Sequence, residues 1–122
     1  MGKKKNILIV DDDVKIINSM KSFLEEKGYD VVNAPDGEVA LDILGEIVPD
    51  LIILDIVMPK IDGFTVAKAI KYNEKTKDVP IIVISAKDGM KELFEIEGIK
   101  DYLIKPADHT KLLELIRNRL GE

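Results

Sequence analysis

Three aspartates, Asp11, Asp12 and Asp13, follow a run of four apolar residues near the start of the chain, and a fourth, Asp55, follows a later apolar run. Adjacent carboxylates repel one another, and burial makes their charged forms more costly still. The chain has no cysteine and one histidine, so a metal site built from these aspartates has oxygen ligands, which suit Mg²⁺ or Mn²⁺. Unit charges 4 Å apart interact by about 4 kcal/mol at an effective dielectric near 20, so a divalent cation would relieve the repulsion.

Two further polar residues follow apolar runs and could bind a phosphoryl group, namely Ser85 and Lys105. Mg²⁺ usually takes one or two carboxylates and completes its shell with water and phosphate oxygens. A site that combines the aspartates with Ser85 and Lys105 is therefore suited to a phosphoryl group, with the hydroxyl and the ammonium as donors to its oxygens.

Five short apolar segments alternate with segments of helical spacing. The predicted strands are Asn6–Val10, Asp30–Ala34, Asp50–Leu54, Pro80–Ile84 and Asp101–Ile104. The first helix is predicted from Val14, Ile17, Met20 and Leu24, the second from Val39, Ile43 and Ile47, the third from Phe64, Ala67 and Ile70, and the last from Leu112, Leu113, Ile116 and Leu120. A short fourth helix is expected from about Gly89 to Glu97, with Leu93, Phe94 and Ile96 as its apolar residues.

Strict alternation of strands and helices predicts an α/β fold, a parallel sheet with helices on both faces. For five units the common arrangement is the doubly wound, flavodoxin-like one with strand order 2-1-3-4-5. We expect one domain over residues 1–122, with its core from about 6 to 120. Ligands of such sheets bind beyond the carboxyl ends of the strands, where the order reverses. The strands that border this point are the ones that end in the aspartates, Ser85 and Lys105.

Composition excludes several classes of protein. The absence of cysteine excludes disulfides and thiol chemistry, and a lone His109, expected at the surface or at a helix start, excludes a histidine-rich metal cluster. The net charge of −5 argues against nonspecific nucleic-acid binding, and a group of lysines is interpreted as a solvated face: Lys68, Lys71, Lys75 and Lys77. No apolar run approaches the ~20 residues of a membrane span and no signal peptide is recognisable, so a cytoplasmic protein is expected.

Four motifs, in this order, resemble those of the CheY-like receiver domains of bacterial two-component response regulators. They are the acidic pair Asp11-Asp12, the stretch DIVMPKIDG from Asp55 to Gly63, the pair Ser85-Ala86 and the pair Lys105-Pro106. Each motif alone is weak, but each falls at the end of a predicted strand. The resemblance covers residues 6 to 120.

The resemblance implies a role for each matching residue at the acidic site. Asp55 would be the nucleophile that takes a phosphoryl group from the phosphohistidine of a histidine kinase. Asp12 would bind Mg²⁺ directly and Asp11 through water, with Asp55 and the backbone carbonyl of Val57 as the remaining protein ligands. Lys105 would pair with the phosphoryl oxygens.

The resemblance also implies a switch. Ser85 would move to hydrogen-bond the phosphoryl group, and Tyr102 would turn inward, which alters the face made by the fourth helix, the fifth strand and the fifth helix. The bond between Lys105 and Pro106 would be cis. The implied partners are a histidine kinase or phosphotransfer protein upstream and a protein target or output domain downstream, without direct contact to nucleic acid or membrane.

The protein implied is a phosphorylation-controlled signalling module rather than an enzyme, although it would promote its own phosphorylation and dephosphorylation. It would act as a monomer or as a dimer promoted by phosphorylation.

The sequence departs from the family pattern in places. The span from Ser85 to Lys105 is slightly short and Gly89 lies near the start of the fourth helix, so that helix is expected to be truncated or mobile. Ala107 stands where a phenylalanine commonly follows the Lys-Pro pair. Val57 and Lys87 occupy positions that in the family govern the approach of water to the phosphoryl group. An apolar Val57 predicts slow self-dephosphorylation.

Three other functions share part of this pattern. A flavodoxin-like electron carrier would need a small polar loop where Asp11–Asp13 would repel the flavin phosphate. A haloacid-dehalogenase-type phosphatase would need a second acid where Val57 stands. A receiver-like interaction domain that is never phosphorylated is argued against by the intact site residues. Asp13 is interpreted as the N-cap or a first-turn acid of the first helix rather than as a metal ligand.

Overall fold

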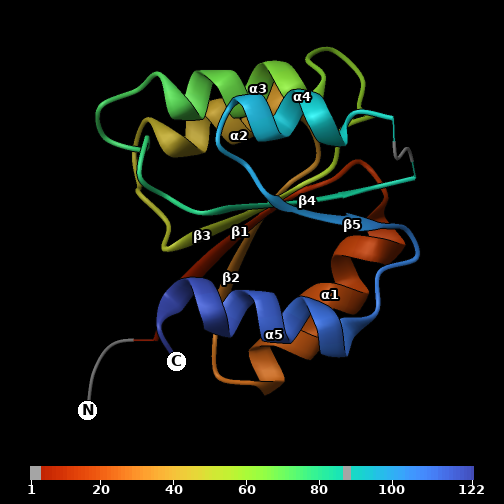
Figure 1. Cartoon of the computed structure of the whole chain (residues 1–122). Coiled ribbons are helices and arrows are strands. Elements are labelled where there is room, and N and C mark those ends of the chain that lie inside the picture. The colour runs from red at the N-terminus through yellow and green to blue at the C-terminus, as the bar shows by residue number, and fades with distance from the viewer. Residues whose placement is uncertain (1–3, 87–88) are drawn as a thin grey trace.

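The computed structural model describes residues 4–86 and 89–122. Strands and helices alternate along the whole of this range (Figure 1). The elements are β1 (Asn6–Val10), α1 (Val14–Glu26), β2 (Asp30–Ala34), α2 (Gly37–Leu44), β3 (Leu51–Leu54), α3 (Gly63–Lys71), β4 (Ile81–Ser85), α4 (Lys91–Ile96), β5 (Asp101–Ile104) and α5 (His109–Leu120). In the described part of the chain no helix is long and apolar enough to cross a membrane.

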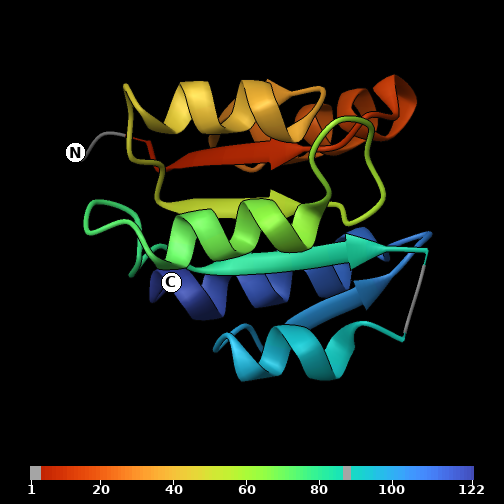
Figure 2. The ribbon, with the colours of Figure 1, turned by 90° about the horizontal axis from the view of Figure 1, so that it is seen from above.

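The five strands form one parallel sheet in the order β2-β1-β3-β4-β5, as predicted. Figure 2 shows the arrowheads of β1, β3, β4 and β5 pointing the same way, and β2 is parallel to β1, so the carboxyl ends of all five strands lie along one edge. β1, β3 and β4 are almost entirely buried, because helices cover the sheet on both faces and leave no wet side for polar residues.

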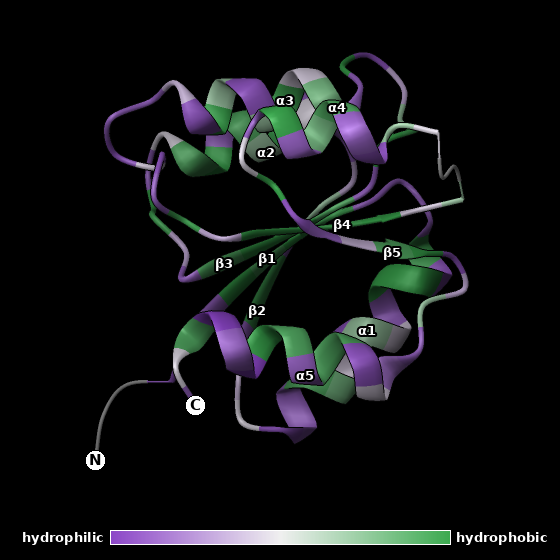
Figure 3. Cartoon of the chain, in the orientation of Figure 1, coloured by the Kyte–Doolittle hydropathy of each residue, from purple (hydrophilic) through white to green (hydrophobic). Residues whose placement is uncertain are grey.

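The sheet separates two hydrophobic cores. Helices α2, α3 and α4 cover one face, and α1 and α5 cover the other (Figure 1). Successive strand residues point to opposite faces, so Leu8 and Val10 pack in the first core while Ile7 and Ile9 pack in the second. Figure 3 shows this partition as apolar strands between helices whose outer surfaces are largely polar.

Aspartate side chains cap four of the five helices at their N-termini, where free backbone N–H groups need acceptors. The caps are Asp13 for α1, Asp36 for α2, Asp62 for α3 and Asp108 for α5. Asp13 is thus the N-cap that the sequence predicted. α4 begins at Lys91 without a side-chain cap, and it is the shortest helix of the described chain.

Four apolar residues that were assigned to helix faces are instead exposed. Val14 at the first turn of α1 is 65% exposed, and Ile47 lies beyond α2, which ends at Leu44 with Gly45 as its C-cap. In α4, Leu93 and Ile96 are 44% and 79% exposed while Phe94 is fully buried. Helical spacing identifies an apolar stripe, but only the packing of neighbouring elements decides how far the stripe is covered.

Candidate functional site

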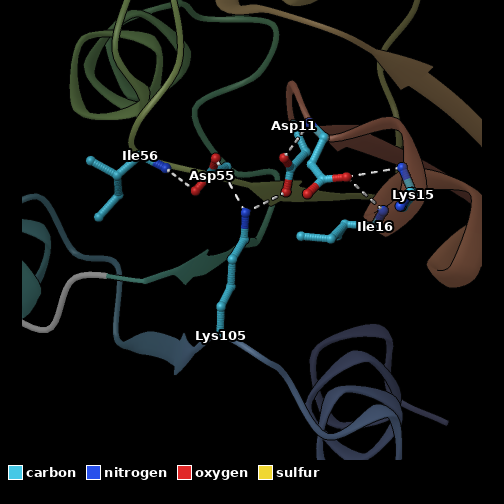
Figure 4. A network of polar contacts seen from close by, with 7 residues as sticks. Asp11, Lys15, Ile16, Asp55, Ile56 and Lys105 are labelled. Atoms are coloured by element: carbon cyan, nitrogen blue, oxygen red, sulfur yellow. Dashed lines mark hydrogen bonds and ion pairs between the residues drawn. The ribbon is translucent and has the colours of Figure 1, made fainter.

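The residues predicted to form a site come together at the carboxyl edge of the sheet. Asp11 follows β1, Asp55 follows β3, Ser85 ends β4 and Lys105 follows β5. Figure 4 shows the side chain of Lys105 reaching toward both Asp11 and Asp55. Residues from opposite ends of the sequence therefore meet because parallel strands all end at this edge.

Three carboxylates of the site could hold a metal ion together. One ligand oxygen from each of Asp11, Asp12 and Asp55 lies within 4.8 Å of the others. Asp11 and Asp55 are buried, with 2% and 4% of their surface exposed, whereas Asp12 is open to solvent. The cluster thus combines two buried acids with one that faces solvent.

Asp55 is held in place by backbone contacts on both sides. Its N–H donates to the carbonyl of Val10 at 2.9 Å, and its Oδ1 accepts a hydrogen bond from the N–H of Ile56 at 2.9 Å. Gly63 packs directly behind it, because a Cβ there would overlap the carbonyl oxygen of Asp55. Only a residue without a side chain fits this position, which explains the glycine of the DIVMPKIDG stretch.

Burial raises the pKa of the Asp55 carboxyl above its usual value, and the negative charge of Asp11 raises it further. The ammonium of Lys105 and the N–H of Ile56 oppose this shift without cancelling it. The carboxylate is therefore poorly hydrated and close to a second negative charge, so a cation bound here would stabilise its ionised form.

Lys105 is the cation that the fold itself supplies. Its Nζ lies 2.9 Å from Asp11 Oδ2 and 3.4 Å from Asp55 Oδ2. Burial alone would lower the pKa of this lysine, but its contacts with Asp11 and then with Asp55 outweigh that effect, so the pKa is raised and the side chain is charged. The bond from Lys105 to Pro106 is cis, as the resemblance predicted.

The two residues assigned to the switch lie on adjacent strands. Ser85 is fully buried at the end of β4, and the half-buried Tyr102 in β5 pairs in register with Val83. The ring of Tyr102 packs 5.9 Å from that of Phe94 of α4. The contact between Tyr102 and Phe94 therefore connects β5 to α4.

Val57 is the predicted metal ligand that contributes a backbone atom. Its side chain is 53% exposed and points into no core cluster of the described residues. It lines an open hollow of about 340 Å³ together with Ile56, Met58, Asp62, Phe64 and Met90. Solvent therefore reaches the side chain of Val57, which offers it no hydrogen-bonding group. Lys87, the other residue assigned to this role, lies outside the described residues.

The donor set fits a hard divalent cation. Three carboxylates against one lysine give the site a formal charge of −2 when all are ionised. Carboxylate oxygens with one open, solvated side are what Mg²⁺ binds, since it keeps several waters in its shell. Asp11, Asp12 and Asp55 are the carboxylates that could hold it, and a contribution from the carbonyl of Val57 stays a prediction.

Sequence reasoning from side-chain types missed the backbone donors. The N–H groups of Ile56 and Asp13 each donate to a site carboxylate, at 2.9 Å to Asp55 and 2.9 Å to Asp11. Every residue carries such a group, so its type gives no signal. His109, in contrast, is where it was expected: it is the first residue of α5, and its ring packs 4.8 Å from that of Phe23.

Comparison with known proteins identifies the family. Residues 7–117 match the model of the response regulator receiver domain, and the chain belongs to that family. It is 38% identical over 91% of its length to the DNA-binding dual master transcriptional regulator RpaA of Synechocystis, of which it covers 47%. The chain spans about half of the length of this and several other curated relatives.

Solved structures give the same result. A putative response regulator from Chloroflexus aurantiacus superposes with a TM-score of 0.92 at 33% identity, over 98% of this chain and all of that one. The receiver domain of a sensor histidine kinase from Pseudomonas aeruginosa has a TM-score of 0.88 at 28% identity, covering 98% and 99% of the two chains. That structure holds a magnesium ion coordinated in its active site cleft. The predicted fold is thus confirmed as that of CheY-like receivers.

Proposed function

We propose that Asp55 is the phosphoacceptor of a two-component signalling system and that it takes its phosphoryl group from a phosphohistidine in a magnesium-dependent reaction. The observation that carries the proposal is the position of Asp55, buried at the end of β3 between the carboxylate of Asp11 and the ammonium of Lys105. An acid in this setting has a fixed orientation, a nearby cation and a solvated approach.

The proposed step is a phosphoryl transfer between two side chains. A carboxylate oxygen of Asp55 forms a bond to phosphorus, the bond from phosphorus to the donor's imidazole nitrogen breaks, and that nitrogen recovers its electron pair. The Asp55 pKa is raised, so the neighbouring cations are needed to keep the carboxylate ionised as a nucleophile. When bound, Mg²⁺ would neutralise negative charge on the phosphoryl oxygens.

The chain's own residues bind and orient the transferred group. Asp11 and Asp12 hold the cation, while Lys105 exchanges its contact with Asp55 for one with a phosphoryl oxygen. Ser85 donates its hydroxyl to another phosphoryl oxygen, and the movement of β4 that this requires is transmitted to Tyr102. The changed face of α4, β5 and α5 is then read by a downstream protein or output domain.

Intact-mass measurement tests the proposal directly. The chain is incubated with acetyl phosphate in the presence of Mg²⁺, or Mn²⁺ in a parallel sample, and again with a chelator. We expect one added phosphoryl group with metal and none with chelator. Asp55→Asn should gain none, whereas Asp62→Asn, which changes an exposed aspartate on the same loop, should be phosphorylated like the unchanged chain.

The alternative is a receiver-like module that binds its partner without phosphorylation. It would be favoured if the folded chain gained no mass with acetyl phosphate or with a phosphorylated histidine donor protein. Labelling of Asp55→Asn at the same stoichiometry would refute Asp55 as the acceptor while leaving phosphorylation itself in place.

A further inference from the structure

The turn between β1 and α1 contains a second hydrogen-bonded arrangement, which is centred on Asp13. Its carboxylate Oδ1 accepts hydrogen bonds from the N–H groups of Lys15, at 2.9 Å, and Ile16, at 3.3 Å. Its own N–H donates to Oδ1 of Asp11 at 2.9 Å. One residue therefore contacts the helix through its side chain and the metal-site acid through its backbone.

The two contacts depend on each other through the backbone of Asp13. Capping holds this residue in the extended conformation, with φ −89° and ψ 106°, because only there can its side chain reach the amides of the first turn. The direction of its N–H is fixed by the same backbone. The cap thus sets where the hydrogen bond to Asp11 points.

Each carboxylate oxygen of Asp11 has its own partner. Oδ1 accepts from the Asp13 N–H, and Oδ2 lies 2.9 Å from the Nζ of Lys105, the contact seen in Figure 4. The lysine ends a long side chain with several rotatable bonds and can leave when a divalent cation or a phosphoryl group arrives. The amide belongs to the capped backbone and stays, so it is the permanent restraint on the Asp11 carboxylate.

Asp13 does not join the metal group itself. The cluster of oxygens within 4.8 Å of one another comprises Asp11, Asp12 and Asp55 among the described residues. The Asp13 side chain is exposed and its capping oxygen is already shared by two amides. As a screened surface charge it changes the affinity for a cation only weakly, by about twofold.

We infer that Asp13 is a positioning residue for the metal site: by capping α1 it fixes the amide that orients Asp11 toward Mg²⁺. The inference rests on the proposed function for the identity of the ligand, but the orientation of Asp11 exists without it. What matters in Asp13 is then the capping oxygen and not the negative charge.

Two substitutions separate these properties. Asp13→Asn keeps a side-chain oxygen that caps well and removes the charge, whereas Asp13→Ala removes both. Asp108→Ala is the matched control, because Asp108 caps α5 with the same geometry, accepting from Thr110 at 2.7 Å and Lys111 at 3.3 Å. Mg²⁺ affinity is measured for each variant by titration calorimetry, and stability by thermal unfolding.

We expect Asp13→Asn to bind Mg²⁺ within about twofold of the unchanged chain. Asp13→Ala should bind about fivefold more weakly, a factor that corresponds to the usual effect of losing an N-cap. Asp108→Ala should lose a similar amount of stability while keeping its Mg²⁺ affinity. A purely structural role would affect Asp13→Ala and Asp108→Ala alike.

A second measurement needs no metal. Hydrogen exchange at the amide of residue 13, followed by NMR, reports its bond to Asp11, and we expect protection in the unchanged chain and in Asp13→Asn but not in Asp13→Ala. If Asp13→Ala does not fold, Asp13→Gly replaces it, because glycine at an N-cap costs only a few tenths of a kcal/mol and also lacks the capping oxygen.

Three results would overturn the inference. Equal weakening in Asp13→Asn and Asp13→Ala would show that charge is what matters, and unchanged affinity in Asp13→Ala would show that the cap does not orient Asp11. Equal weakening in Asp108→Ala would assign the effect to general stability. If the unchanged chain bound no Mg²⁺, the proposed function would fail instead, and the metal-free exchange comparison would still decide whether the cap orients Asp11.

Discussion

Lys105 lies closer to Asp11 than to Asp55: its Nζ is 2.9 Å from an oxygen of the first and 3.4 Å from an oxygen of the second. In the absence of a metal, the lysine therefore serves as the counter-ion of both buried acids. A cation that binds Asp11 competes with the lysine for this carboxylate, and the freed ammonium is then available to a phosphoryl oxygen.

Replacement of Lys105 by methionine should destabilise the metal-free protein by about 3 kcal/mol, because it leaves two buried carboxylates without their shared cation. Saturating Mg²⁺ should recover more stability in this variant than in the unchanged chain. Urea denaturation with and without Mg²⁺ measures both effects.

Lys60→Met is the control. Lys60 pairs with Asp36 at 3.6 Å, and its side chain is 57% exposed, so this substitution should lower the free energy of unfolding by less than about 1 kcal/mol. Equal Mg²⁺ stabilisation in all three proteins would contradict the prediction.

Val57 should make the phosphorylated state long-lived. Its apolar side chain lies two residues after Asp55, lines the hollow that begins at Ile56 and cannot orient an attacking water. We expect the phosphorylated protein to have a lifetime of minutes or longer at room temperature. Intact-mass measurements after removal of the phosphodonor determine this lifetime. Val57→Asn, which places a hydrogen-bonding group there, should shorten the lifetime severalfold, and Val57→Leu should not. A lifetime of seconds in the unchanged chain would refute the prediction.

Gly63→Ala should be among the most disruptive single-methyl changes in the chain. The added Cβ would overlap the carbonyl of Asp55 and come within 2.7 Å of the Cα of Ile56, so the backbone behind the acceptor must move. We expect a loss of about 3 kcal/mol in the free energy of unfolding, measured by urea denaturation. Gly89→Ala, where a Cβ would meet no atom within 4 Å, should change stability by less than about 0.5 kcal/mol. Similar losses in both variants would show that the close approach is not what requires glycine.

Tyr29 should ionise later than an ordinary tyrosine. Burial, together with a hydrogen bond donated by its hydroxyl to Glu122 at 2.6 Å, raises its pKa to about 12. A raised pKa in the folded state contributes stability that is fully present below pH 10 and is lost as the pH rises through 12. Absorbance at alkaline pH should show a late phase that Tyr29→Phe removes and Glu122→Gln shifts to lower pH. A titration curve of Tyr29→Phe that differs only in amplitude, with the late phase retained, would contradict the assignment.

The fold could be predicted from the sequence because the central strands are short, continuous apolar runs. The run from Ile7 to Val10 is buried on both faces, and such runs alternating with amphipathic segments permit few other arrangements. The site followed from the fold, since Asp55 and Lys105 could be assigned to strand ends before any distance was known. Side chains on helices were harder to predict: Val14 has the spacing of a core residue, yet it is 65% exposed, because spacing does not show how far neighbouring elements cover a helix end.

The connections within the site could not be predicted, because backbone groups make many of them. That the amide of Asp13 would bind Asp11, or the amide of Ile56 would bind Asp55, depends on dihedral angles that residue types leave open. The relative closeness of Lys105 to its two acids depends likewise on the rotamer of a long side chain.

Helix α4 packs against the rest of the molecule through few buried side chains. Of its six residues, all of which the structure describes, Phe94 is the buried one, held between the rings of Phe64 and Tyr102. Detaching this helix exposes the side chain of a single phenylalanine, on the order of 2 kcal/mol, whereas α1 and α5 would each expose three core residues. Of these three helices, α4 should therefore be the one that opens most readily by local unfolding.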